Sequence, residues 1–188
     1  MSSPKFPTLG LRTARLTLQE LAIDDAPELF RYYVENRQHL QPWEPSRADE
    51  FYTIEAIDRR IASMVQQMRA ENALHLLIRN SESEAVTGEC NFTNIVRGPF
   101  QACYLGFSIA AGAQGRGLMY EALERAIEFV FETYALHRVM ANYRPENVRS
   151  GQLLKRLGFE VEGTARAYLK INGAWADHVL TSRINDKL

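Results

Sequence analysis

The chain has no excess of charge of one sign, no long apolar run and few cysteines. Its 22 basic and 23 acidic residues give a formal net charge of −1 over 188 residues, and no basic block suggests direct nucleic-acid binding. No apolar run is long enough to span a bilayer, and residues 1–7 lack the apolar core of a signal peptide. We therefore expect a cytoplasmic protein with no nucleic-acid partner and no membrane partner.

The two cysteines are Cys90 and Cys103, and both lie in strand-like segments. Their positions do not give the paired spacing that zinc sites use, so we expect no metal. We interpret both as buried free thiols, and the sequence leaves a disulfide between them open. With 46% hydrophobic and 24% charged residues, the composition and length suit one globular domain spanning residues 1–188.

Strand-like and helix-like patterns alternate along the chain, without internal repeats or low-complexity linkers. Alternating or apolar segments predict strands over residues 11–21, 73–79, 85–96, 100–110, 138–143, 159–171 and 174–184. Helical spacing and end signals predict helices over residues 24–36, 54–68, 119–134 and 147–157. The central strand, turn, helix and strand form a βαβ unit with a right-handed parallel crossover. The prediction is an α/β protein with a mixed sheet and helices on both faces.

A glycine-containing segment, Gln114-Gly115-Arg116-Gly117-Leu118-Met119, lies between a predicted strand and an amphipathic helix. Two glycines allow a tight turn and close approach to a ligand, and the following helix offers unpaired N–H groups that favour an anion. The segment is a candidate pyrophosphate cradle, with a simple strand-to-helix turn as the alternative. It lacks the Gly-Lys-Ser or Gly-Lys-Thr ending of a Walker loop and the third glycine of a dinucleotide fingerprint.

The order of elements and residues resembles the GNAT superfamily of N-acetyltransferases over nearly the whole chain. The matching features are strand residues 104–109, Gln114 and Gly117, a long helix, a strand, Asn147, and Leu157-Gly158-Phe159. The resemblance implies a mostly antiparallel twisted sheet with a splayed parallel pair and about four helices. It also implies acetyl-CoA as co-substrate, with its pyrophosphate bound by main-chain N–H groups of the glycine segment. Met119 departs from the family pattern, which usually has glycine or alanine there.

Segments outside the glycine loop are similar to the Rim group of ribosomal-protein N-acetyltransferases, especially those that act on an N-terminal alanine. They include Glu35-Asn36-Arg37, Pro42-Trp43-Glu44-Pro45, Ala102-Cys103-Tyr104-Leu105-Gly106 and Asp177-His178-Val179-Leu180-Thr181. The resemblance implies acetyl transfer to the N-terminal α-amine, expected to be alanine, of a ribosomal protein by a monomer or homodimer. Two alternatives stay open: an acetyltransferase for a small amine (an aminoglycoside, a polyamine or an amino acid), and a non-catalytic CoA-binding ribosome-assembly factor.

Catalytic roles also follow from the resemblance. Direct attack of a neutral amine on a thioester needs a stabilised oxyanion, a proton acceptor and a proton donor. In the family, backbone near Ser108 and Ile109 faces the acetyl carbonyl, and Asn147 contacts the pantetheine arm. Ser150 matches a serine to which a Rim-group relative assigns the general-acid role. Its alternative is a first-turn hydroxyl that bonds the Asn147 backbone, and Asn147 is also a natural N-cap.

The general base is not assigned by the resemblance, because the family's glutamates are replaced by Asn142 and Leu169. The remaining candidates are Glu35, Glu44, Glu89 and Asp177, with the imidazoles of His39 and His178. An N-terminal amine with a pKa near ~7.8 is about one-tenth neutral at pH 7, against roughly one lysine in a few thousand. An N-terminal acceptor therefore needs little base, which favours an α-amine over a lysine side chain.

Residues 37–47 are predicted to be a loop that recognises the acceptor. This segment mixes His39, Trp43 and Glu44 with prolines and is too polar to be core. Its aromatic and proline groups suit an extended peptide, although Trp43 could instead attach the loop to the protein body. Tyr168, Lys170 and Trp175 on the last hairpin are candidates for an opposite wall, with cross-strand packing as the alternative.

Overall fold

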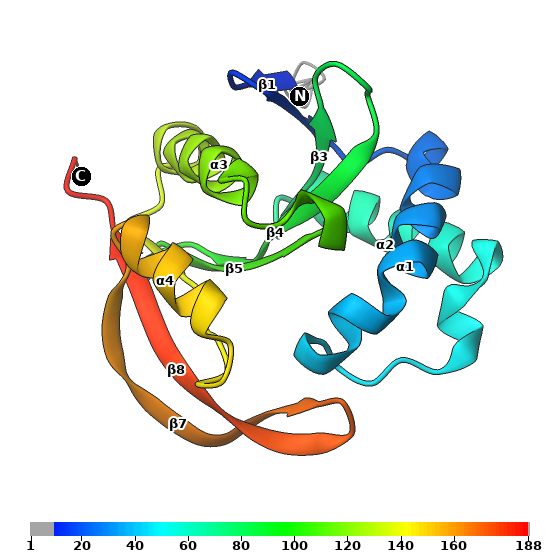
Figure 1. The fold of residues 1–188 in the computed structure, drawn as a ribbon. Coiled ribbons are helices and arrows are strands. Elements are labelled where there is room, and N and C mark those ends of the chain that lie inside the picture. The colour runs from blue at the N-terminus through cyan, green and yellow to red at the C-terminus, as the bar shows by residue number, and fades with distance from the viewer. Residues whose placement is uncertain (1–9, 188) are drawn as a thin grey trace.

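The computed structural model describes residues 10–187, in which one sheet is covered by helices on both faces (Figure 1). Its strands are β1 (Gly10–Arg12), β2 (Leu16–Glu20), β3 (Leu74–Asn80), β4 (Val86–Val96), β5 (Ala102–Ile109), β6 (Arg138–Met140), β7 (Glu160–Ile171) and β8 (Ala174–Ile184). The helices are α1 (Ala26–Leu40), α2 (Ile54–Arg69), α3 (Leu118–Tyr134) and α4 (Val148–Arg156). Short 3-10 turns are η1 (Ile23–Asp25), η2 (Gln41–Trp43), η3 (Asp49–Tyr52) and η4 (Ala111–Ala113).

The sheet has eight strands in the order β1-β2-β3-β4-β5-β6-β8-β7. Among the described residues, β5 and β6 form the one parallel pair, and the other neighbours are antiparallel. This arrangement confirms the predicted mixed α/β class and the mostly antiparallel sheet. Within the described range, no helix is long and apolar enough to cross a membrane.

Two hydrophobic cores lie on opposite faces of the sheet. On β3, Leu76 and Ile78 belong to the core with α3 and α4, whereas Leu77 belongs to the core with α1 and α2. Successive strand side chains point to opposite faces, so a strand covered on both sides has consecutive buried residues. The five consecutive buried residues at the start of β3 follow from this double coverage.

The parallel pair separates partway along its length. The β5–β6 pairing runs from Ala102 with Arg138 to Tyr104 with Met140, where β6 ends. Strand β5 continues to Ile109, and within the described residues no strand pairs with residues 105–109 on that side. The predicted splayed pair is therefore present, and it leaves an opening beside the end of β5.

Several boundaries differ from the sequence prediction; the strand predicted over residues 138–143, for example, ends at Met140. The predicted strand 11–21 is divided by a turn in which the Thr13 hydroxyl accepts a hydrogen bond from the Leu16 N–H (3.0 Å). Helix α1 continues to Leu40, so the first four residues of the predicted loop 37–47 are helical. Leu40 is buried in the α1–α2 core, and Pro42 follows it in η2. Because packing extends the helix and proline stops it, His39 is carried by a rigid element.

Cys90 and Cys103 are buried free thiols on adjacent strands, as predicted. Burial raises the pKa of the Cys103 thiol to about 12, even though Arg97 lowers it in part. Burial also raises the pKa of the Cys90 thiol. Both side chains therefore stay protonated near neutral pH and serve as small core residues.

Gly88 allows a close approach between β4 and β5. A Cβ atom there would lie 2.5 Å from the Ser108 carbonyl oxygen and 3.3 Å from the Ile109 Cα. Both neighbours are backbone atoms, so they cannot move aside cheaply. We expect Gly88→Ala to lower the free energy of unfolding by about 1–3 kcal/mol, as overpacking does. Urea denaturation would measure the loss. Gly106→Ala is the control, because nothing lies within 4 Å of its added Cβ, and equal midpoints for the two variants would refute the steric explanation.

Candidate active site

One cavity of about 980 Å³ brings together most of the site residues predicted from the sequence. Its lining includes Ser108 and Ile109 of β5, the turn and first residues of α3, the start of α4, and the end of α1 with η2. The predicted residues on this lining are His39, Trp43, Glu44, Ser108, Ile109, Gln114, Gly115, Gly117, Leu118, Met119, Asn147 and Ser150. Because Ser108 and Ile109 point to opposite faces of the sheet, the cavity extends across the opening beside β5.

The glycine loop adopts the conformation that its sequence predicts. Gly115 and Gly117 have φ angles of 71° and 75°, in the left-handed region that favours glycine. Gly117 is the N-cap of the 17-residue helix α3. No atom lies within 4 Å of a Cβ built on Gly115, so the loop backbone is open on that side. The unpaired N–H groups and the dipole of α3 therefore make this end of the helix suitable for an anion.

Residues of the turn between β1 and β2 bind the glycine loop and the first turn of α3. Arg15 Nη1 donates to the Arg116 carbonyl oxygen (3.0 Å), and Arg15 also pairs with Glu121 in the first turn of α3 (2.7 Å). Glu121 also accepts hydrogen bonds from the Thr13 hydroxyl (2.5 Å) and the Arg15 N–H (2.8 Å). Burial raises the pKa of Glu121, but these hydrogen bonds outweigh it and the pKa is lowered overall. The Arg116 side chain is exposed and Arg116 does not line the cavity.

Met119, the departure from the family pattern, is accommodated by the core. It is buried in the α3–α4 core, and its Cε would lie 3.5 Å from a Cβ on Gly88. The methionine side chain therefore occupies space next to the closely paired β4 and β5. The change from glycine or alanine to methionine therefore adds a side chain to the core, and the loop keeps its main-chain N–H groups.

The backbone of Ile109 faces the opening. The Ala110 N–H donates to the Thr87 carbonyl oxygen on β4 (2.8 Å). N–H groups alternate along a strand, so the Ser108 N–H points to β4 and the Ile109 N–H points away from it. His39 Nε2 lies 3.2 Å from the Ile109 carbonyl oxygen. Of the two backbone donors predicted here, Ile109 is the one oriented toward the opening.

Gln114 connects the glycine loop to two helices. Its Nε2 lies 3.1 Å from His39 Nε2 at the end of α1, and its Oε1 accepts a hydrogen bond from Arg149 Nη1 of α4 (2.7 Å). The side chain that the sequence places at the start of the motif therefore fixes the relative positions of α1, the loop and α4. Arg149 also lines the cavity and was not predicted.

Asn147 caps helix α4 and leaves the Ser150 hydroxyl free. Asn147 Oδ1 accepts a hydrogen bond from the Ser150 backbone N–H (3.2 Å). Among residues 10–187, the Ser150 hydroxyl itself makes no hydrogen bond, so it does not bond the Asn147 backbone as the structural alternative supposed. Ser150 lines the cavity and its hydroxyl is available to a ligand.

Glu44 is the partly buried carboxylate of the cavity. Its side chain is 20% exposed, and Arg47 Nε lies 3.3 Å from its Oε2. Burial raises the pKa of Glu44, and Arg47 offsets part of this rise. Its neighbour Trp43 is 39% exposed at the same end of the cavity. This end therefore combines an aromatic surface with a carboxylate whose proton affinity is increased.

The other three candidate carboxylates lie outside the cavity. Glu35 is exposed on α1. Glu89 is buried and accepts a hydrogen bond from the Tyr33 hydroxyl (2.5 Å), and Arg60 Nη2 lies 3.7 Å from it. Asp177 accepts a hydrogen bond from the Ala167 N–H (2.8 Å) on the neighbouring strand. None of these three carboxylates lines the cavity.

Further predicted residues lie near the last hairpin, whose turn curves toward the end of α1 (Figure 1). The Asn172 N–H at this turn donates to the Glu44 carbonyl oxygen (3.0 Å). Lys170 and Trp175 are exposed cross-strand partners, and Trp175 is 67% exposed. His178 is buried, with Nδ1 lying 3.0 Å from the Ala176 carbonyl oxygen. The hairpin therefore adjoins Glu44 without lining the cavity.

A residue that sequence reasoning missed is Tyr32. Its hydroxyl lies 2.8 Å from the Ser108 Oγ, which lines the cavity. Tyr32 is buried on α1 at apolar helical spacing, a pattern that does not reveal that its hydroxyl reaches β5. The contact fixes the Ser108 side chain on the α1 face of the sheet.

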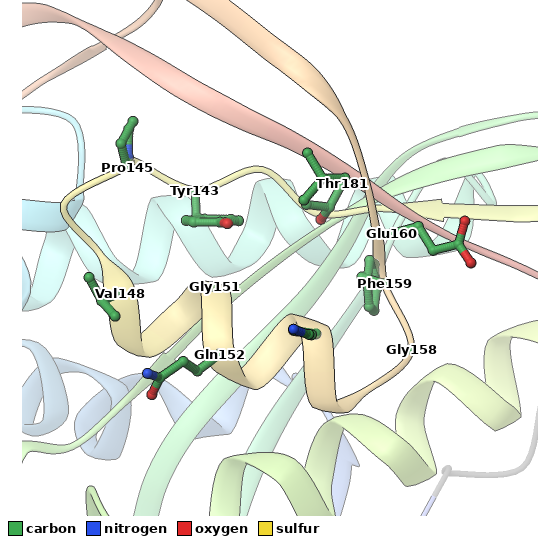
Figure 2. A pocket seen from close by; sticks show the side chains of 11 residues that line it. Tyr143, Pro145, Val148, Gly151, Gln152, Gly158, Phe159, Glu160 and Thr181 are labelled. Atoms are coloured by element: carbon green, nitrogen blue, oxygen red, sulfur yellow. The ribbon is translucent and has the colours of Figure 1, made fainter.

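A second cavity of about 710 Å³ lies on another side of α4, next to β7 and β8 (Figure 2). The Tyr143 ring lies beside Gly151, where an added Cβ would be 2.7 Å from the ring. The Thr181 hydroxyl in this cavity donates to the Ala141 carbonyl oxygen. No predicted site residue is among the described residues that line it.

Comparison with known proteins agrees with this architecture. Residues 15–160 match the model of the acetyltransferase (GNAT) domain family. The chain is 44% identical over 176 residues to the [ribosomal protein uS5]-alanine N-acetyltransferase of Escherichia coli (strain K12), covering 94% of this chain and 91% of the relative.

Two solved structures share the fold over nearly the whole chain. A ribosomal-protein-S5-alanine acetyltransferase from Vibrio fischeri superposes with a TM-score of 0.90 and 36% identity, covering 95% of this chain and 97% of the other. Mycobacterium smegmatis RimJ in complex with CoA-disulfide superposes with a TM-score of 0.87 and 26% identity, covering 92% and 83%. The family match and the extent of these similarities lead to one conclusion: the chain belongs to the GNAT family of acetyltransferases.

Proposed function

We propose that this protein transfers the acetyl group of acetyl-CoA to the N-terminal α-amine of a ribosomal protein, and that the acceptor residue is alanine. The observation that carries the proposal is the continuity of one cavity from the glycine loop, past Ser108 and Ile109, to Trp43 and Glu44. The names of the E. coli and V. fischeri relatives support an N-terminal alanine acceptor.

The glycine loop and α4 fit a CoA ligand. The loop backbone is open beside Gly115, and the N-terminal end of α3 favours the pyrophosphate. Asn147 and Arg149 of the α4 end line the same cavity. The bound cofactor supplies an activated thioester carbonyl, and RimJ of M. smegmatis, solved with CoA-disulfide, supports the assignment.

Three groups of this chain perform the chemistry in the proposed reaction. The Ile109 N–H, which points to the opening, stabilises negative charge on the acetyl oxygen. Glu44 holds the acceptor ammonium and takes its proton, directly or through water, because its raised pKa increases its proton affinity. The Ser150 hydroxyl, which has no protein partner within the described residues, donates a proton to the departing thiolate.

The charge of the cavity favours a peptide acceptor over a polycationic one. Glu44 and Glu146 are the only acidic residues among the described lining residues, and the Glu146 side chain is 65% exposed. A polyamine or aminoglycoside carries several positive charges, which two carboxylates match poorly. An N-terminal amine carries one charge, which Glu44 alone can neutralise.

The test offers acetyl-CoA with four acceptors: an Ala-starting peptide, the same peptide with a blocked N-terminus and one lysine, a polyamine, and an aminoglycoside. Thiol release and product mass are measured for each. We expect transfer to the free N-terminus and little to the blocked peptide. Transfer confined to the polyamine or aminoglycoside would replace the proposal with a small-amine acetyltransferase. Absence of transfer to every acceptor would overturn the enzymatic assignment of the cavity.

A further inference from the structure

Arg144 lies between β6 and α4 and contacts two separate parts of the active site. Its Nη1 donates to the Pro42 carbonyl oxygen (3.0 Å), 102 positions earlier in the chain. Its Nε lies 3.4 Å from Glu146 Oε2, and its side chain is 28% exposed. A single guanidinium therefore links η2 to the segment that precedes α4.

Both residues that Arg144 contacts lie in the cavity lining or directly beside it. Pro42 adjoins Trp43 and Glu44, the acceptor end of the cavity. Glu146 lines the cavity and precedes Asn147, the cap whose Oδ1 fixes the first turn of α4 and hence Ser150. Arg144 therefore lies between the residues proposed to bind the acceptor and those proposed to bind CoA and donate a proton.

The position of η2 depends on few contacts. Residues 41–43 are exposed, so burial contributes little to holding them in place. The segment is held on one side by Arg144 at Pro42 and on the other by the Asn172 N–H at Glu44. Removal of Arg144 would leave the Pro42 side without this hydrogen bond.

The guanidinium suits this double contact better than an ammonium. Its donors are spread over a planar fork, so it bonds a carbonyl oxygen with one nitrogen while pairing with a carboxylate through another. The Arg144 Nε is buried without a hydrogen bond among residues 10–187, and the ion pair with Glu146 compensates it. Lysine would reach one of the two partners at a time.

We propose that Arg144 is a positioning residue that couples the acceptor segment Pro42-Trp43-Glu44 to the start of α4. This inference rests on the proposed function for its kinetic consequence, but the coupling itself is a property of the fold. Loss of Arg144 loosens η2, so the acceptor binds more weakly, while Asn172 still holds the Glu44 backbone and the proton donor on α4 remains in place.

Kinetics test the consequence. We expect Arg144→Ala to raise KM for the Ala-starting peptide about tenfold, with kcat reduced less than threefold, because one charge-assisted hydrogen bond is lost. Arg144→Lys should recover part of the loss. Arg31→Ala is the matched control, since Arg31 is exposed on α1. A peptide KM for Arg144→Ala equal to that of the parent enzyme would overturn the inference and leave the proposed function intact.

Fluorescence tests the coupling without any acceptor. The two tryptophans are Trp43 and Trp175, so a Trp175→Phe background isolates Trp43. Trp43 is 39% exposed in the parent protein. We expect Arg144→Ala to raise its acrylamide quenching about twofold, because a loosened η2 exposes the indole ring further. Arg31→Ala should leave it unchanged. Equal quenching with and without Arg144 would overturn the coupling, whatever substrate the protein acetylates. Failure of the transfer assay alone would overturn only the proposed function.

Discussion

Replacing Ser150 with alanine is expected to lower kcat for acetyl transfer by about 10²- to 10³-fold and to leave KM for acetyl-CoA nearly unchanged, if Ser150 is the proposed proton donor. The variant retains the Ser150 backbone N–H, which donates a hydrogen bond to Asn147 Oδ1, so the helix cap is preserved. Only the hydroxyl is removed, and within the described residues it has no protein partner to lose. The expected effect is therefore on proton donation and not on folding.

Steady-state kinetics over a range of pH measure this loss. Ser63→Ala is a matched control, because Ser63 is an exposed serine on α2, away from the cavity. Its kcat should stay within about twofold of the parent value, as expected for a surface change. If Ser150→Ala retained more than half of the parent kcat, the general-acid role would be excluded and the serine would be a local structural residue.

We expect replacement of Glu89 with alanine to lower the free energy of unfolding by about 3–5 kcal/mol, because a buried carboxylate and its contacts with Tyr33 and Arg60 are lost. The carboxylate is 7% exposed and accepts a hydrogen bond from Tyr33, and Arg60 lies 3.7 Å away. Its removal leaves the Arg60 guanidinium, whose side chain is 24% exposed, without its carboxylate, and the buried Tyr33 hydroxyl without its acceptor. A chain of this size should then melt on the order of 10 °C lower.

The comparison of two Glu89 variants separates stability from catalysis. Glu89→Gln keeps an acceptor for Tyr33 and should lose less stability than Glu89→Ala, with kcat near the parent value. Glu35→Ala is the control, because Glu35 is exposed and its loss should change stability by less than about 0.5 kcal/mol. A stable Glu89→Gln variant with kcat reduced a hundredfold would instead identify Glu89 as the base.

Local sequence patterns predicted the elements that carry the cofactor side of the site. The spacing of Gly115 and Gly117 predicted a tight turn, in which both glycines have positive φ angles. Apolar residues at helical spacing predicted the buried face of α3. These features depend on residues close together in the chain. For the same reason Asn147 could be identified as a cap before its contact with the Ser150 N–H was known.

The acceptor side depends on contacts between distant segments, which local patterns do not reveal. Glu44 and Glu89 were equal candidates in the sequence, because strand alternation does not say which face of β4 is covered by α1. The turn of the last hairpin reaches Glu44 through Asn172, 128 positions away, and Arg144 reaches Pro42 over 102 positions. Such pairings become visible only when the sheet order is known.

The proposed function depends most directly on acetylation of an N-terminal alanine. The decisive measurement is kcat/KM with peptides that are identical except for a first residue of Ala, Ser or Met, with the modified atom located by mass spectrometry. We expect the highest kcat/KM for the Ala peptide and a single acetyl group on its α-nitrogen. Equal rates for all first residues, or acetyl groups found on lysine side chains, would contradict it.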